Sequence, residues 1–346
     1  MKRILFLFLI ISWIAFPANA MEIEAPTVPH FAEEFMPREP QNLSEGIREL
    51  LKTAISGLRP DLREAMDVCI GVFASVMLLA LLRSFPGKSE KPLELAGALC
   101  LSVQMLTSSG SLINLAAATV THISEYGKLL LPVMTSALAA QGGITASSAI
   151  YAGTALFDSV LSSLISRIMI PLVYIFLALS TIGSGIGAEM LKKCRDCVKW
   201  VMTWVLKTVL YIFTGYIGIT GVVSGATDAA AMKVAKLTIS GVVPVVGGIL
   251  SDASEAILVS AATIKNTAGI YGLLAIGAIW IGPFLKIGVH YVLLRITGIL
   301  CGIFGGKSLS DLIQDYASAM GLLLGMTGAV CLMFLISLIC FMKGVG

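Results

Sequence analysis

Charged side chains are scarce in this chain: only 13% of its 346 residues are Asp, Glu, Lys or Arg. Soluble domains usually carry about 25%. In contrast, 57% of the residues are hydrophobic. So few polar side chains cannot cover the surface of a soluble protein of this size. The composition therefore excludes a soluble enzyme, a disordered tail protein, a coiled coil and a disulfide scaffold, and it predicts an all-α polytopic membrane protein.

Residues that carry chemistry are also few. The three histidines, His30, His122 and His290, lie far apart and form no HExxH motif. Cys194 and Cys197 form a CxxC without a second CxxC, which favours neither a zinc site nor a thioredoxin-like motif and leaves a redox or metal role as the minor alternative. We therefore predict no enzyme activity, no cofactor and no metal. The net charge of +3 is too small to indicate a nucleic-acid partner.

Residues 1–20 have the pattern of a secretory signal peptide. Two basic residues precede a short apolar run over 4–16, and Ala-Asn-Ala ends at Ala20. The alternative is an uncleaved first transmembrane helix, but the run is shorter than the roughly 20 residues that a span needs. We predict cleavage after Ala20, and under either interpretation the residues that follow are exported.

Residues 21–66 form the one long polar region, with ten of the 21 acidic residues in it or at its edge. Four prolines predict an extended linker over 21–41. Apolar residues then recur at helical spacing from Leu43 to Leu58. They predict a small amphipathic helix outside the membrane. It either lies on the membrane surface, packs on its own bundle as a spacer, or docks a partner.

The remainder, 67–346, is predicted to be the polytopic membrane domain. Residues 128–165 are apolar but interrupted by Pro132 and paired glycines, so they could form a re-entrant pair or two crossings. Basic residues in 192–199 and near Arg83 mark cytoplasmic loops. We expect about seven spans, near 67–83, 93–119, 167–187, 200–223, 268–285, 287–304 and 319–342. Because this number of spans is odd, it leaves the C-terminus inside.

Ionisable residues inside spans are functional candidates by default. Arg167, His290 and Arg295 form this set, whereas Lys207 and Lys286 lie near span ends and can snorkel. The alternative to a transport path is structural ion pairing. Under that alternative Asp158 or Glu189 pairs with Arg167 across the bundle.

Residues 227–266 are too polar for an ordinary span and too apolar for a loop. Pro and paired Gly should break a first helix, and Ser or Asp can cap a second. We predict a broken amphipathic or re-entrant segment on the outer side, the alternative being an interfacial hairpin that only packs. Its candidate functional residues are Lys236, Pro244, Gly247, Gly248, Ser251, Asp252 and Lys265.

The same stretch carries a family resemblance. The motif PVVGG-x-x-SDA over 244–253, together with VAK at 234–236 and IKN at 264–266, resembles the stage III sporulation protein AE family. The signal peptide, the acidic outer region and the polytopic remainder are similar too. The resemblance thus extends over most of the chain.

The resemblance implies a function that composition does not. Family members are made in the mother cell and belong to a complex that spans the two membranes around the engulfed forespore, like a secretion channel or feeding tube. That complex is needed for late forespore gene expression and integrity. The implied partners are other stage III sporulation membrane proteins and the lipid bilayer, in the mother-cell-derived outer forespore membrane with the N-terminal region in the intermembrane space. The resemblance supplies no catalytic residues, and whether the chain forms a homo-oligomer is left open.

The rival function is a self-sufficient secondary transporter. Such proteins usually show paired repeats and broken helices in both halves. Candidate breaks occur near Pro132 and Pro244, but no convincing repeat accompanies them. The sequence leaves open the transported species, the stoichiometry and whether this chain lines a pore.

Overall fold

The computed structural model describes residues 26–37, 43–83, 90–242, 247–304 and 306–343. Side chains are described within these ranges except at 90–91, 221–262 and 264. The described backbone is helical apart from short turns and caps. Its elements are α2 (His30–Glu33), α3 (Leu43–Ser56), α4 (Leu58–Arg83), α5 (Glu90–Ala140), α6 (Ile144–Leu164), the π-helical turn η1 (Ile165–Met169), α7 (Ile170–Ile186), α8 (Glu189–Val242), α9 (Gly247–Phe304) and α10 (Lys307–Lys343).

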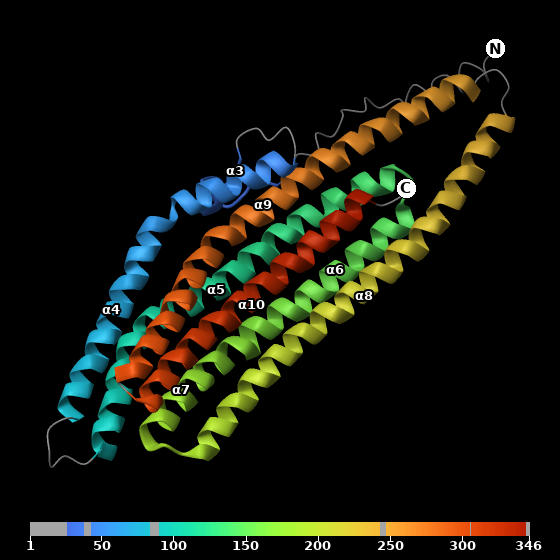
Figure 1. Ribbon diagram of the computed structural model, residues 1–346. Helices are drawn as coiled ribbons and strands as arrows, with labels where there is room; N and C mark the ends of the chain where they lie inside the picture. The colour runs from blue at the N-terminus through green and yellow to red at the C-terminus, as the bar shows by residue number, and fades with distance from the viewer. Residues whose placement is uncertain (1–25, 38–42, 84–89, 243–246, 305, 344–346) are drawn as a thin grey trace.

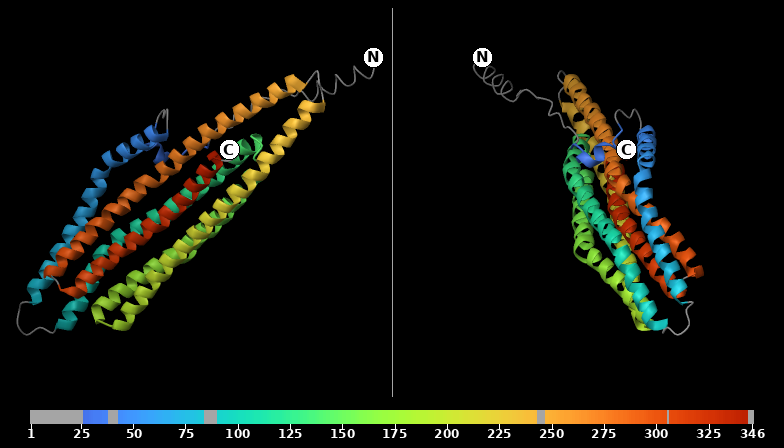
Figure 2. Two further views of the ribbon diagram at one scale, coloured as in Figure 1. Left: turned by 45° about the vertical axis from the view of Figure 1, so that its right-hand side comes forward. Right: turned by 90° about the vertical axis from the view of Figure 1, so that its left-hand side faces the viewer.

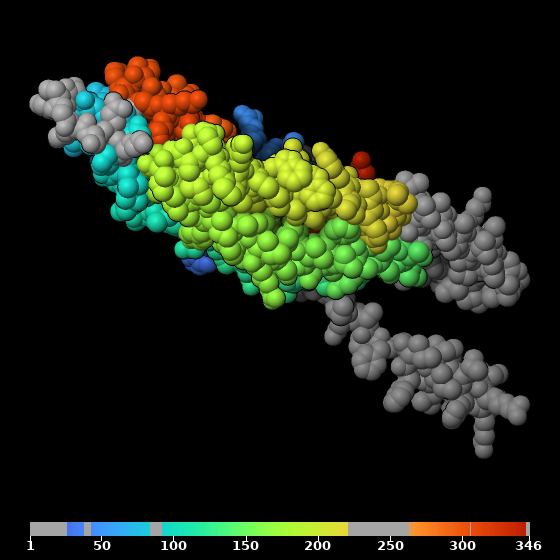
Figure 3. All heavy atoms as spheres, turned by 90° about the horizontal axis from the view of Figure 1, so that it is seen from below, coloured from blue at the N-terminus to red at the C-terminus, as the bar shows by residue number. Residues whose placement is uncertain are grey.

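The long helices run side by side in alternating directions and form one elongated bundle (Figure 1). Helices α4 and α9 lie along one side, α6, α7 and α8 along the other, and α5 and α10 between them (Figures 1 and 2). Seen from below, α6, α7 and α8 form the near face of the described part (Figure 3). The short helix α3 turns away from α4 at Gly57 and rests on α9.

Six helical stretches of the described chain are long and apolar enough to cross a membrane. They are Leu58–Arg83, Pro92–Ala140, Ile144–Ile186, Glu189–Thr220, Lys265–Phe304 and Lys307–Lys343. The all-α polytopic fold is therefore confirmed, but the expected count of seven spans is wrong.

The difference in the number of spans comes from Pro283 and Lys286, which interrupt the apolar sequence but do not end the helix. The expected spans 268–285 and 287–304 are one helix, α9, which runs through Pro283 and Lys286. Proline is tolerated in membrane helices because neighbouring groups satisfy the freed backbone. The ammonium group of Lys286 is neutralised by ion pairs with α4 instead of ending the helix.

Residues 128–165 form neither a re-entrant pair nor two separate crossings. Helix α5 continues through Pro132 to Ala140. The turn that follows has Gly142 at φ 92°, a left-handed conformation that glycine adopts without strain. Helix α6 then begins at Ile144 and continues through η1 into α7. The segment is thus the tip of one long antiparallel helix pair.

An even number of spans returns the chain to the end of the bundle where it entered. Helix α10 ends at Lys343 on the same end as α3 (Figure 1). The described helices therefore differ from the expected arrangement, in which the two lie at opposite ends, and the side of the membrane that each faces stays a prediction.

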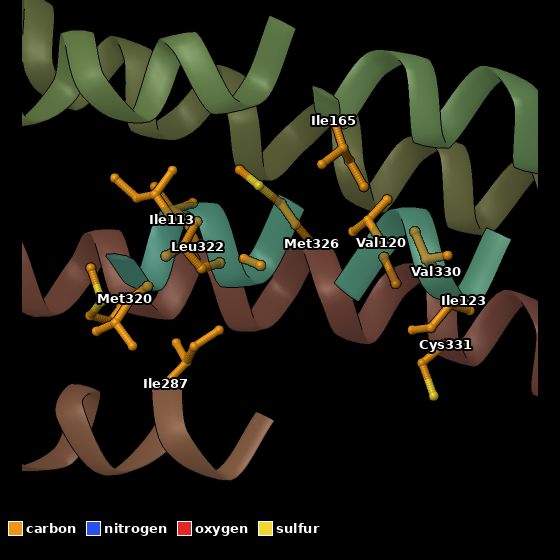
Figure 4. Close-up of a cluster of buried hydrophobic side chains, with 14 of the residues drawn as sticks. Ile113, Val120, Ile123, Ile165, Ile287, Met320, Leu322, Met326, Val330 and Cys331 are labelled. Carbon is orange, nitrogen blue, oxygen red and sulfur yellow. The ribbon is translucent and has the colours of Figure 1, made fainter. Parts of the chain in front are cut away.

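Helix α10 forms the centre of the core, and most of its length is buried by the other helices. Side chains of α5 and α10 interleave along their contact (Figure 4). Ile165 of η1 and Ile287 of α9 close this layer from opposite sides. All the residues labelled there are at most 9% exposed: Ile113, Val120, Ile123, Ile165, Ile287, Met320, Leu322, Met326, Val330 and Cys331.

Helices α8 and α9 are much longer than a bilayer requires. Helix α8 has 54 residues and α9 has 58. At 1.5 Å per residue each is about 80 Å or more in length, against a hydrocarbon core of about 30 Å. The last turns of α8 and the first turns of α9 converge beyond the ends of α5, α6 and α10 as a helical hairpin (Figures 1 and 2).

Candidate functional site

The three ionisable candidates of the spans lie apart in the structure. Arg167 is exposed on η1. His290 is 2% exposed on α9. Arg295 lies further along α9, where its guanidinium donates to the Gln314 side chain of α10. They form no shared site, and their functional roles stay predictions.

Asp158 does not serve as the partner of Arg167 that the sequence allowed. It is 1% exposed on α6, and its Oδ2 accepts a hydrogen bond from Ser124 of α5 at 2.7 Å. The other carboxylate oxygen has no hydrogen-bond partner in the described part of the chain. One turn away, the Thr154 hydroxyl lies 2.7 Å from that of Ser337 on α10. These polar groups lie at the contact of α5, α6 and α10.

His290 lies at the edge of a charged cluster that joins α4 to α9. The ammonium group of Lys286 lies 2.7 Å from Glu64 and 3.4 Å from Asp61. The Nδ1 of His290 is 2.9 Å from the Lys286 carbonyl oxygen, which can only accept, so Nδ1 carries the proton. Lys286 thus forms ion pairs in place of the expected snorkelling. Sequence reasoning missed its partners because Asp61 and Glu64 were assigned to the outer polar region.

A second charged cluster lies at the opposite end of the bundle. Arg195 of α8 reaches Asp315 of α10 at 2.6 Å, and Lys199 donates to Ser318 at 3.1 Å. The sequence placed these cations in a loop, whereas α8 already begins at Glu189. Sequence analysis also missed Asp315. Its only signal was an acidic residue within an otherwise apolar stretch.

The segment 227–266 is divided between two helices. Residues up to Val242, including Lys236, continue α8, and Gly247 begins α9. Pro244 lies outside the described residues. The predicted break at Pro244 therefore lies outside the described residues and stays a prediction.

The second half of that segment is helical from its glycines onward. Gly247 and Gly248 lie in the first turn of α9. Ser251 and Asp252 lie inside the helix, not at the cap position that the sequence suggested. Lys265, at the start of the next candidate span, is 7% exposed.

The CxxC pair lies near the start of α8. Cys194 and Cys197 are both exposed and free. No group of three or more His, Cys, Asp or Glu side chains that could hold a metal ion occurs among the described residues. Some described charges instead pair between helices: Arg83 with Glu94, Arg195 with Asp315, and Lys286 with Asp61 and Glu64.

Comparison with known proteins identifies the family. The sequence matches the family "Stage III sporulation protein AE" over residues 31–344. It is 22% identical over 238 residues to the "Stage III sporulation protein AE" of Bacillus subtilis (strain 168). That match covers 69% of this chain and 60% of the relative. No solved structure matches this chain. With six candidate membrane spans among its described residues and a family match over nearly its whole length, this chain belongs to the stage III sporulation protein AE family.

Proposed function

We propose that this chain is a membrane subunit of a sporulation-specific channel or feeding-tube complex between mother cell and forespore. The observation that carries the proposal is the family match over residues 31–344. Its partners in the proposal are other stage III sporulation membrane proteins. Late forespore gene expression and forespore integrity then depend on it.

The charge distribution supports an orientation with the α3 end in the intermembrane space. Basic residues gather at the opposite end, near Arg83, at 192–199 and at Lys307. The turn at 141–143 lies in a stretch, 129–166, that contains no Lys or Arg, and the stretch 237–264, where α8 ends and α9 begins, contains none either. Lys and Arg are enriched on the cytoplasmic side of membrane proteins. The basic end then faces the mother-cell cytoplasm, in the outer forespore membrane.

The long α8–α9 hairpin supports a role in a complex that bridges two membranes. With 54 residues α8 is about 81 Å long, against a hydrocarbon core of about 30 Å. In the proposed orientation this hairpin projects into the intermembrane space. There it can reach a partner that the membrane-embedded helices cannot touch. The hairpin also contains the residues on which the family resemblance rests.

Substituting the glycines in the first turn of α9 tests the proposal. Gly247→Leu or Gly248→Leu should leave normal amounts of protein in the membrane but block spore formation after engulfment. Gly288→Leu is the matched control, because a side chain there meets nothing within 4 Å and lies far along the same helix. Asp252→Ala should be milder unless its charge faces a partner or a pore.

The measurements are the amount of protein in isolated membranes and the yield of heat-resistant spores. Normal spore yield from both the Gly247 and the Gly248 variants would mean that spore formation does not depend on the hairpin. A fall of protein amount in step with spore yield would indicate a packing role only. Expression during vegetative growth, in place of after asymmetric division, would favour the secondary transporter instead.

A further inference from the structure

An apolar groove runs between the amphipathic helix α3 and the two membrane helices beneath it. Its volume is about 280 Å³. Leu50 and Leu51 of α3, Gly277 and Trp280 of α9, and Leu335 of α10 are among the residues that line it. Almost no polar atom faces the groove. A water molecule needs two to four polar partners, so water is a poor occupant.

The apolar surface of the groove continues onto the outside of the protein. Ile47 and Leu51 of α3 are 46% and 44% exposed, and Ile339 of α10 is 43% exposed. All three also line the groove. The groove is therefore open along one edge to whatever surrounds α9 and α10.

That surrounding medium is the bilayer. The α9 wall of the groove lies within the candidate span Lys265–Phe304, and the α10 wall lies within Lys307–Lys343. The third wall, α3, has the residue pattern of a helix that lies in a membrane interface. Leu50 and Ala54 are buried against the bundle, whereas Arg48 and Lys52 are exposed.

Trp280 of α9 contributes its indole ring to the wall of the groove. Its Nε1 is buried, so an occupant of the groove meets the ring through apolar atoms. The fluorescence of this ring therefore reports on what fills the groove.

We propose that α3, α9 and α10 form a binding groove for one acyl chain of a bilayer lipid, with the Trp280 ring in its wall. Bound lipid then joins the exported helix α3 to the membrane helices. The apolar face of α3 is only partly used by protein contacts, and the lipid covers the rest. This inference does not depend on the sporulation role.

Fluorescence quenching tests the proposal in the full-length chain. Trp13, Trp200 and Trp204 are replaced by Phe, which leaves Trp280 as the single tryptophan. The protein is placed in phosphatidylglycerol vesicles whose acyl chains carry bromine at mid-chain. We expect bromine to quench Trp280 strongly.

Variants that fill the groove distinguish quenching by a bound acyl chain from quenching by bulk lipid. Leu335→Phe and Ile339→Phe each place a larger side chain in the groove, and most of the quenching should be lost. Leu332→Phe is the control, because Leu332 is 51% exposed on the same helix and does not line the groove. Its quenching should equal that of the parent.

Three results would overturn the proposal. Absence of quenching in the parent would mean that protein, such as a second copy or the chain's own apolar run over 4–16, fills the groove. Equal quenching in the parent and in both filled variants would mean that Trp280 senses bulk lipid only. Equal loss in Leu332→Phe would mean a general change of fold. Helical circular dichroism of each variant identifies misfolded protein, and Ile339, being partly exposed, is the more tolerant position.

Discussion

Arg195 on α8 and Asp315 on α10 form an ion pair of 2.6 Å across 120 residues of sequence. Their side chains are only 15% and 14% exposed. Arg195 has a second partner, Asp196, at 2.8 Å. Among the described residues, Arg195 is the one cation within ion-pair distance of Asp315. The two residues therefore depend on each other unequally.

This inequality predicts asymmetric stability changes. Arg195→Met leaves the Asp315 carboxylate mostly buried without its ion pair, and we expect a loss of about 3 kcal/mol in the free energy of unfolding. Asp315→Asn should cost less, because Arg195 keeps Asp196. The double variant should recover part of the loss, since no uncompensated charge stays buried. Unfolding by denaturant in detergent micelles measures all three, and equal single losses would contradict the argument.

Gly127 of α5 lies directly under the ring of Phe334 on α10, so a side chain there would overlap the ring. Phe334 is 1% exposed and cannot move into solvent. Gly127→Ala should therefore destabilise the protein by about 1–3 kcal/mol through overpacking. Gly110→Ala on the same helix meets nothing within 4 Å and should be neutral or slightly stabilising. Thermal unfolding of the two purified variants distinguishes these outcomes, and similar melting temperatures would refute the close contact.

The buried Ser124–Asp158 hydrogen bond predicts that shape matters more than charge at Asp158. Ser124→Ala removes the one hydrogen bond described for that carboxylate and should cost about 1–3 kcal/mol. Asp158→Asn keeps an acceptor for Ser124 and should stay close to the parent in stability. Protein amount in membranes and unfolding by denaturant provide the readouts. If Asp158→Asn is stable but blocks spore formation, the carboxylate has a role beyond packing.

The six-span arrangement predicts which ends of the bundle react with an impermeant thiol reagent. The native cysteines are replaced and the chain is produced in the cell membrane of non-sporulating cells, where the reagent reaches its outer side. Met190→Cys at the basic end should then stay unlabelled in intact cells. Gln141→Cys, in the turn after α5, should be labelled. Lys343→Cys should also be labelled, whereas a seven-span topology predicts protection there. Labelling of Met190→Cys from outside would reverse the proposed orientation.

The fold class and the family followed from the sequence alone for identifiable reasons. A chain with 57% hydrophobic and 13% charged residues must lie in lipid, where isolated backbone polar groups are costly and helices satisfy them locally. The motif from Pro244 to Ala253 indicated the family, and the match over residues 31–344 confirms it. Both properties depend on composition or on residues that are neighbours in the sequence. They can therefore be predicted without knowing which helices contact each other.

Only the tertiary structure decided where the helices end and which charges are satisfied. Pro132 was expected to interrupt the stretch 128–165, and two spans were expected at 268–285 and 287–304, yet α5 continues through Pro132 and α9 through Pro283. Proline is tolerated in membrane helices because neighbouring groups satisfy the freed backbone. Lys286 looked like a span boundary, yet Glu64 lies 2.7 Å away on another helix. These outcomes depend on contacts between residues hundreds of positions apart. Hydropathy averages over neighbours in the chain, so it cannot register a charge that is neutralised by a distant one.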